Sequence, residues 1–295
     1  MMGRILVTGA GGKLGGLVVK HLLETEKVAA SDIVAASRTP EKLTDFAAQG
    51  VETRKVDFND PESLKTAFAG IDKLLIVSTD ALDGEGTRLR QHKTAIAAAG
   101  AAGVSRIFYT SLPNPAESAV SFAPDHLGTE EAIKASGLAY TIFRNDWYQE
   151  NTLMALPHAL AGGQWFVASG EGRIPYIARE DCARAIAAGL ARTPAGNTIH
   201  TLTGAEALSA AETAAIVSEI TGKPLAVVQI SDEQLVEGLK SAGFPEPVAL
   251  TLASFDVNQR KGLFEPVTGD FKELTGRDPV AFRTFVAENK AAFLA

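Results

Sequence analysis

The sequence predicts a doubly wound parallel α/β sheet, with a smaller α+β lobe on its C-terminal side. Two observations support this fold class. Over residues 5–144, short apolar runs alternate with segments that begin with helix-capping residues or end at glycine. The chain also has 295 residues, more than the usual domain of about 100–200 residues. Because parallel strands need crossover helices, we expect helices on both faces of the sheet.

Six buried strands are expected in the first half of the chain. We place them at residues 5–8, 33–37, 51–56, 73–77, 106–110 and 140–144, and each except 51–56 is a short, mainly apolar run. Helices are expected at residues 14–23, 39–50, 60–70, 92–99 and 123–136. Thr39 and Asp60 both precede Pro-Glu, a pattern in which the side chain caps the helix and proline occupies the first turn.

The second half is less regular. Helices are expected at residues 179–190, 209–221 and 232–242, and strands at 198–202 and 225–230. Ser209 and Glu212 have the spacing of a capping box. We expect residues 1–144, completed by about 175–203, to form the sheet domain. Residues 145–174 and 204–295 are expected to form the smaller lobe, which would bind substrate by closing over the strand ends.

The charge balance argues against nucleic acid as a partner. The chain has 28 Lys and Arg against 35 Asp and Glu, a net charge of −7, whereas nucleic-acid binding needs a basic surface. No apolar run approaches the ~18 residues of a membrane span, and no signal peptide is recognisable. We therefore expect a cytoplasmic protein without a membrane partner. The oligomeric state is open, and a homodimer is compatible with the sequence.

The cysteine and histidine content predicts neither disulfides nor a metal site. Cys182 is the one cysteine, so an intrachain disulfide and a cysteine-rich metal cluster are excluded. The histidines are scattered, with no spacing suited to metal ligands; they are His21, His92, His126, His158 and His200.

The strongest functional signal is a glycine-rich turn between the first strand and the first helix. Its glycines at 9, 12 and 15 suit a tight turn, a close approach of backbone to pyrophosphate, and close packing of helix on strand. The pyrophosphate of a dinucleotide would then meet the helix N-terminus. The turn predicts a Rossmann-like domain in which the cofactor contacts Thr8, Gly9, Gly11, Gly12, Lys13, Leu14 and Gly15.

The end of the second strand predicts NADPH rather than NADH. NAD-binding proteins carry an acidic residue there for the ribose 2′-hydroxyl, but residues 35–38 read Ala-Ala-Ser-Arg. Arg38 can grip a 2′-phosphate with its forked donors, and Lys13 adds a second charge. The alternative is a solvated arginine at a helix start. By their positions after later strands, further cofactor contacts are expected from Asp57, Phe58, Ser78, Thr79, Thr110 and Ser111.

Several longer stretches carry a family resemblance. They are residues 108–112 (FYTSL), 126–130 (HLGTE), 140–151 (YTIFRNDWYQEN) and 274–279 (LTGRDP). They resemble the atypical, NmrA-like branch of the short-chain dehydrogenase/reductase superfamily. Within it the sequence is most similar to type 2 NAD(P)H:quinone oxidoreductases and triphenylmethane reductases. This resemblance covers nearly the whole chain.

One departure from the broad superfamily bears on the chemistry. Typical members use Ser, Tyr and Lys, with Tyr-x-x-x-Lys on one helix face. Here Ser111 is in place, but His126 stands at the tyrosine position and Glu130 at the lysine position. This weakens an assignment as an alcohol dehydrogenase or sugar epimerase, which need an acid/base group at the carbinol oxygen. His126 is either a proton donor or hydrogen-bond partner for the acceptor, or a structural histidine at a helix start.

The resemblance implies an NADPH-dependent, flavin-free oxidoreductase that transfers hydride to quinones or similar conjugated acceptors. Such an acceptor makes weak demands on the protein, because the product oxyanion is delocalised over a ring. We expect Asn145 and Tyr148, after the sixth strand, to contact the acceptor, with packing between the lobes as the alternative for Tyr148. Two rival functions remain: a redox sensor that binds NADP without turnover and signals to a protein partner, and a reductase of triarylmethane or azo dyes.

Overall fold

The main sheet is parallel throughout and reverses its winding direction in the middle. The computed structural model describes residues 3–83, 85–192, 194–264 and 266–295. Seven strands run in the order β3-β2-β1-β4-β5-β6-β9. They are β1 (Ile5–Val7), β2 (Ile33–Ser37), β3 (Glu52–Lys55), β4 (Lys73–Ile76), β5 (Arg106–Ser111), β6 (Ala139–Asn145) and β9 (Thr198–Leu202). The winding reverses between β1 and β4, the place where doubly wound sheets bind ligands.

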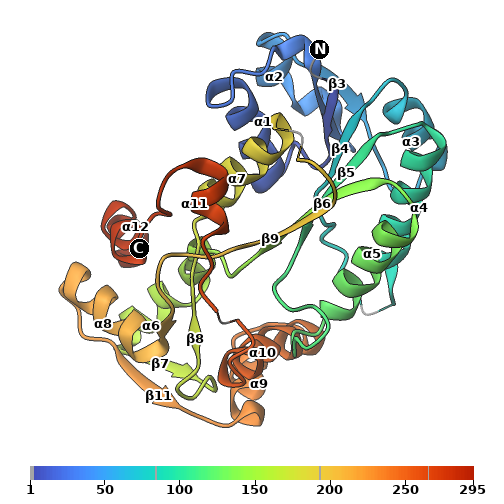
Figure 1. The fold of residues 1–295 in the computed structure, drawn as a ribbon. Helices are drawn as coiled ribbons and strands as arrows, with labels where there is room; N and C mark the ends of the chain where they lie inside the picture. Colours follow the sequence, from blue (N-terminus) through green and yellow to red (C-terminus); the bar gives the residue numbers. More distant parts are fainter. Residues whose placement is uncertain (1–2, 84, 193, 265) are drawn as a thin grey trace.

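Helices cover both faces of this sheet (Figure 1). One face carries α1 (Lys13–Glu24), α7 (Arg179–Ala191) and α11 (Asp270–Thr275); the other carries α3 (Pro61–Phe68), α4 (Thr87–Ala101) and α5 (Ala123–Ala135). Side chains alternate along the strands, as the pleat requires. In β1, Ile5 and Val7 belong to the core under α1 and α7, whereas Leu6 belongs to the core under α3 and α4. The predicted doubly wound fold is confirmed.

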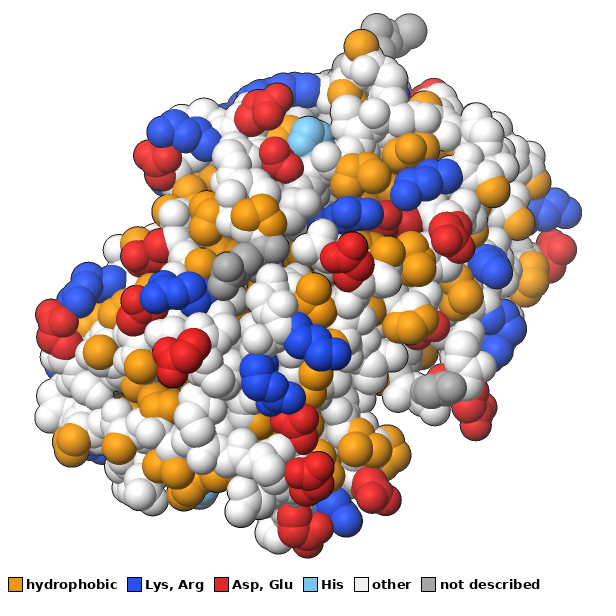
Figure 2. Space-filling model, turned by 60° about the horizontal axis from the view of Figure 1, so that its bottom comes forward, with side chains coloured by type: hydrophobic (Ala, Val, Ile, Leu, Met, Phe, Trp, Pro, Cys, Tyr) orange, Lys and Arg blue, Asp and Glu red, His pale blue; other side chains and the backbone are white. Residues whose placement is uncertain are grey.

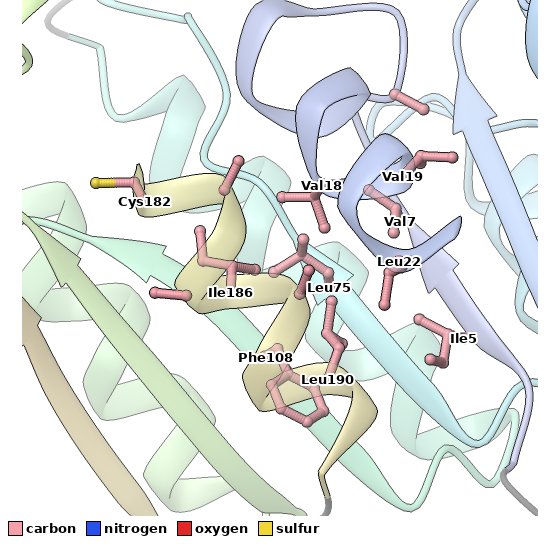
Figure 3. Close-up of a cluster of buried hydrophobic side chains, with 14 of the residues drawn as sticks. Ile5, Val7, Val18, Val19, Leu22, Leu75, Phe108, Cys182, Ile186 and Leu190 are labelled. Carbon is pink, nitrogen blue, oxygen red and sulfur yellow. The ribbon is translucent and has the colours of Figure 1, made fainter. Parts of the chain in front are cut away.

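The core under α1 and α7 shows why these helices are fixed to the sheet. Val18 and Leu22 of α1 meet Ile186 and Leu190 of α7 over the strand residue Phe108, and all five side chains are fully buried (Figure 3). Burying an aliphatic side chain of this size stabilises the fold by roughly 1.5–3 kcal/mol. The interlocked pair α1 and α7 therefore holds the helix that follows the glycine turn at a fixed position.

The other elements from residue 149 onward form a lobe with its own buried cluster, much of it at the bottom of Figure 1. Its strands pair as β7 with β11, parallel, and β8 with β10, antiparallel. Its helices and strands are η3 (Gln149–Met154), α6 (Leu156–Gly162), β7 (Gln164–Val167), β8 (Arg173–Ile174), β10 (Leu208–Ser209), α8 (Ala210–Thr221), β11 (Ala226–Gln229), α9 (Asp232–Ser241), α10 (Glu246–Arg260), α12 (Phe282–Glu288) and α13 (Lys290–Leu294). Stacked aromatic rings of Tyr176, Phe282 and Phe285 lie in this cluster.

One predicted helix is wrong. Residues 39–50 form a 3₁₀ turn, η2 (Pro40–Lys42), and a separate short helix, α2 (Thr44–Ala48); a similar turn, η1 (Ala30–Asp32), precedes β2. The break lies at Leu43, whose backbone is non-helical, at φ −93° and ψ 32°. The Leu43 side chain is buried. Thr39 makes no side-chain cap. The caps predicted for Asp60 and Ser209 are confirmed, Ser209 within a full capping box.

Two further features complete the description. No helix in the described ranges is long and apolar enough to cross a membrane. On the face drawn in Figure 2, acidic and basic side chains are interspersed instead of being gathered by sign.

Candidate functional site

A polar groove lies at the carboxyl ends of β1 to β4, where the winding reverses. Its volume is about 680 Å³. It is lined by Thr8, Gly9, Gly11, Gly12, Ser37, Arg38, Thr39, Lys42, Val56, Asp57, Phe58, Asn59, Val77, Ser78, Thr79, Asp80 and Gln91. A larger groove of about 1100 Å³ lies between α3 and α4 and is floored by alanines. We place the site in the smaller groove, because it gathers backbone, hydroxyl and charged groups at the point where such sheets bind ligands.

The glycine turn has the geometry that a phosphate cradle needs. Gly9 has φ +63°, which favours glycine. A Cβ on Gly15 would lie 2.3 Å from the Gly9 carbonyl oxygen, so only glycine lets α1 pack this close to the turn. Gly12 is the N-cap of α1 and provides no side-chain cap. The first amides of the helix are therefore without a side-chain acceptor, and their positive helix end suits an anion.

The end of β2 brings two cations to the groove and no carboxylate. Ser37, Arg38, Thr39 and Lys42 are the described groove residues from this segment, and both cationic side chains are exposed. Lys42 was not predicted. It reaches the groove because η2 ends at this residue, and that turn was not recognisable from a sequence that resembles an ordinary helix start.

Residues 77–79, which follow β4, line another side of the groove, and side chains from other elements hold them in place. Three consecutive backbone amides donate in turn: Val77 to Thr8 Oγ1 at 3.0 Å, Ser78 to Thr110 Oγ1 at 2.9 Å, and Thr79 to a histidine of α4 at 3.0 Å. Thr8 and Thr110 are both nearly fully buried. Their observed role is to hold residues 77–79, and a direct cofactor contact of Thr110 stays a prediction.

His126 is buried with both ring nitrogens occupied. Arg88 Nη1 lies 2.9 Å from Nε2, and the Tyr109 hydroxyl lies 2.8 Å from Nδ1. Since a guanidinium can only donate, Nε2 accepts and Nδ1 carries the proton. Burial, with Arg88 adding to it, lowers the pKa of His126 well below its ordinary value. The geometry therefore favours the structural interpretation of His126 over the proton-donor interpretation.

Glu130 forms a buried ion pair. Its carboxylate accepts from Arg144 Nε at 2.9 Å and Nη2 at 2.8 Å, and from Ser111 Oγ at 2.8 Å. Burial raises the pKa of Glu130, but the hydrogen bonds from Arg144 and Ser111 outweigh it and hold the pKa below its usual range. The Ser111 hydroxyl is thus directed to Glu130. The three positions that carry Ser, Tyr and Lys in the wider superfamily are here internally paired.

Asn145 and Tyr148 lie together at the end of β6, with β5 between them and β4. Asn145 Nδ2 donates to the Tyr148 hydroxyl at 3.0 Å, and the Arg179 guanidinium lies 4.8 Å from the centre of the Tyr148 ring. Burial raises the pKa of Tyr148, so the phenol stays protonated. Asn145 Oδ1 is buried and has no partner among the described residues. This acceptor atom is free for a ligand donor.

The structure brings most of the predicted cofactor residues together. Thr8, Gly9, Gly11, Gly12, Arg38, Asp57, Phe58, Ser78 and Thr79 all line the groove. Lys13, Leu14 and Gly15 follow in the first turn of α1. Thr110, Ser111, His126, Asn145 and Tyr148 lie outside the described lining. Eight lining residues were not predicted as site residues: Ser37, Thr39, Lys42, Val56, Asn59, Val77, Asp80 and Gln91. No sequence signal distinguishes the polar ones from ordinary surface residues.

Comparison with known proteins agrees with this geometry. The NmrA-like family model matches residues 1–280. The chain belongs to the NmrA-like family. A family relative, quinone oxidoreductase 2 of Escherichia coli strain K12, is 38% identical over 258 residues, which are 88% of each chain.

Two solved structures are similar over almost their whole length. An NADPH-dependent quinone oxidoreductase from Escherichia coli, complexed with NADPH, superposes with a TM-score of 0.92 at 35% identity, covering 97% of this chain and 99% of the other. The triphenylmethane reductase of Citrobacter sp., complexed with NADP(H), gives a TM-score of 0.90 at 35% identity with the same coverage. Both proteins are reductases by name, and both structures hold the cofactor predicted here.

Proposed function

We propose that this chain is an NADPH-dependent, flavin-free oxidoreductase that transfers hydride to quinones or similar conjugated acceptors. The observation that carries the proposal is the groove at the β1–β4 reversal, where a glycine turn meets Arg38 and Lys42. A cationic pair beside a phosphate cradle suits a dinucleotide with a further phosphate on its ribose. Family membership and the NADPH-bound relatives support the same conclusion.

The groove residues fit NADPH along its length. The turn at 9–12 and the N-terminus of α1 would hold the pyrophosphate, and Arg38 and Lys42 the 2′-phosphate. Asp57 and Phe58 would flank the adenine, and Ser78 and Thr79 the ribose and nicotinamide. Bound NADPH supplies the hydride. The protein supplies alignment of the two reactants.

The surroundings of α5 limit the choice of acceptor. Its histidine and glutamate are buried in internal pairs, and Ser111 donates to that glutamate. An acceptor that needs a strong acid at its reacting oxygen is therefore a poor substrate. A quinone fits, because its reduced oxygen is stabilised by the ring and takes a proton from water.

We assign acceptor binding to the smaller lobe, at its junction with the sheet; α11, within the predicted range 204–295, packs on the sheet instead. Asn145 offers an unpartnered carbonyl oxygen there, and Tyr148 an aromatic face. Both residues follow β6, which lies on the same side of the winding reversal as β4. An acceptor held there would stand next to the nicotinamide end of the groove.

A second candidate is the reduction of cationic triarylmethane dyes. The similarity to triphenylmethane reductase favours it. Hydride added to the central cationic carbon gives a neutral product and requires no proton, which again suits a site without a strong acid.

The deciding experiment follows NADPH absorbance with a panel of quinones and dyes. Steady consumption with a simple quinone supports the proposal, and consumption with dyes alone supports the second candidate. Tight NADPH binding without turnover on any acceptor overturns both and leaves the redox-sensor interpretation.

A further inference from the structure

Residues 77–79 are held by hydrogen bonds from their three backbone amides. We call these amides and their three side-chain acceptors the clamp. The acceptors come from three separate elements: Thr8 from the end of β1, Thr110 from β5, and His92 from α4. These contacts set the path of the chain as it leaves β4 and lines the groove. The clamp lies on the opposite side of the winding reversal from Arg38, so it faces the half of a dinucleotide that carries the nicotinamide.

His92 is the most constrained member of the clamp. It is fully buried, and its Nδ1 lies 2.9 Å from Thr129 Oγ1, which itself donates to the Asp125 carbonyl oxygen at 2.7 Å. Because the Thr79 amide donates to Nε2, the ring proton is on Nδ1 and points to Thr129. The rings of Phe58 and Tyr109 meet the imidazole edge-on, at 6.3 and 5.4 Å between centroids. Both ring nitrogens are thus hydrogen-bonded, and two aromatic rings pack against the imidazole.

The Thr79 side chain shows what the clamp presents to a ligand. Its Oγ1 is buried and has no partner within the described part of the chain. A buried hydroxyl without a partner is unfavourable unless a ligand completes its hydrogen bonding. Ribose hydroxyls and the nicotinamide carboxamide both offer donors of this kind.

We propose that His92 is a positioning residue for the nicotinamide half of the cofactor, acting through the Thr79 amide. This inference rests on the proposed function. The imidazole does not touch the cofactor; it fixes the backbone that carries the Ser78 and Thr79 hydroxyls. Burial lowers the pKa of His92 to about 3, with Arg88 contributing, so the ring stays a neutral acceptor at ordinary pH.

Two substitutions test the hydrogen bonds of the two ring nitrogens of His92 separately. His92→Asn keeps a donor near the Nδ1 position toward Thr129 but loses the acceptor for Thr79. His92→Gln keeps an acceptor near the Nε2 position and loses the contact with Thr129. Both variants remove the aromatic ring, so each is the matched control for the other. Thermal unfolding of both variants shows whether each is folded.

The readout compares two ligands by calorimetry: NADPH, and adenosine 2′,5′-bisphosphate, which lacks the nicotinamide half. In His92→Asn the Thr79 amide loses its acceptor and hydrogen-bonds to water instead. Binding of NADPH must then restore the conformation of residues 77–79. We expect NADPH affinity to fall about tenfold in His92→Asn and to stay within about threefold in His92→Gln. Affinity for the bisphosphate should be unchanged in both.

A second pair keeps the inference testable if His92→Asn does not fold. Thr110→Val removes the acceptor of the neighbouring amide, and Thr110→Ser keeps it. The valine variant should show the same selective loss of NADPH affinity, and the serine variant should not. Equal losses for both ligands, or no selective loss in any folded variant, would overturn the positioning role. Failure of the unmodified protein to bind NADPH would instead overturn the proposed function, and this inference with it.

Discussion

Arg38 and Lys42 bring two positive charges to the part of the groove that follows β2. A charge-assisted hydrogen bond contributes roughly 1.5–3 kcal/mol. We therefore expect Arg38→Ala to weaken NADPH binding by about 10–100-fold and to leave NADH binding almost unchanged. Lys42→Ala should act in the same direction with a smaller effect, because an ammonium cannot make a forked contact. Calorimetric titration with both cofactors tests this, and equal affinity of the unmodified protein for NADPH and NADH would contradict it.

His126 holds two buried groups in place, and its removal should act mainly on stability. His126→Ala leaves the Arg88 guanidinium and the Tyr109 hydroxyl without their partner. We expect the free energy of unfolding to fall by roughly 2–5 kcal/mol. For a simple quinone at saturating NADPH, kcat/KM should fall by less than about 10²-fold. A loss above about 10³-fold, with fold and NADPH affinity intact, would instead make His126 an obligatory acid.

Tyr148 offers a ring and a hydroxyl that can be removed separately. Tyr148→Phe loses only the hydrogen bond from Asn145, whereas Tyr148→Ala also loses the ring under Arg179. If the ring contacts the acceptor, Tyr148→Ala should raise the KM for a quinone by about 10–100-fold. Tyr148→Phe should raise it by less than about fivefold. An unchanged KM in Tyr148→Ala would show that the ring only packs between the lobes.

At the scale of elements, the glycine turn makes different demands on its glycines. A Cβ on Gly15 would collide with backbone at 2.3 Å, whereas a Cβ on Gly12 would lie 3.3 Å from the Gly9 carbonyl oxygen. Gly15→Ala should therefore destabilise the folded protein by roughly 1–3 kcal/mol as well as abolish NADPH binding. Gly12→Val should keep most of its stability and still fail to bind, because the side chain blocks the pyrophosphate. Urea unfolding with calorimetry tests the contrast, and NADPH binding by Gly12→Val at full affinity would contradict it.

The same scale shows which elements the sequence could predict. Strands with uninterrupted apolar runs were predicted to within a residue or two, as were helices that begin at Asp60 and Ser209. Helix α10 was not predicted, because its apolar residues do not follow one face: Val248 and Leu250 are exposed while Ala249 and Ala253 are buried. The two-residue strands β8 and β10 exist only through their mutual pairing. Contacts between distant segments have no local signal.

Some residues of the site could likewise be predicted from local sequence, whereas others could not. The glycine turn and Arg38 are local features, and their place in the groove follows from their sequence neighbours. The partners of His126 and Glu130 come from α4, β5 and β6. A residue type that is reactive in isolation, such as histidine, acquires its role from those partners, and only the three-dimensional structure reveals them.

For the molecule as a whole, the buried imidazoles predict a loss of stability in acid. An unfolded histidine titrates near pH 6.5, whereas burial, with Arg88, lowers the pKa of His92 to about 3 in the folded chain. Between these values only the unfolded chain takes up the proton, so stability falls as the pH falls below 6.5. For His92 alone the loss at about pH 5 amounts to about 2 kcal/mol.

The measurement is urea unfolding of the unmodified protein and of His92→Gln, near pH 7 and near pH 5. The unmodified protein should lose about 2 kcal/mol more than the variant between the two conditions. Subtracting the variant removes the contribution of carboxylates, which titrate in the same range. An equal loss in both proteins would mean that His92 is protonated in the folded state.

The buried pair of Glu130 and Arg144 also constrains how this scaffold can change its chemistry. Installing tyrosine at 126 and lysine at 130 would add a third cation beside Arg144 and Lys134 and remove the carboxylate that both now share. Breaking a buried pair in this way costs roughly 3–5 kcal/mol, a large part of the stability of a typical domain. A route from this protein to an alcohol dehydrogenase, in evolution or in the laboratory, must therefore change β6 together with α5. Replacement of Glu130 alone is therefore not a viable stepping stone, which is a physical reason for such a lineage to keep acceptors that need no acid.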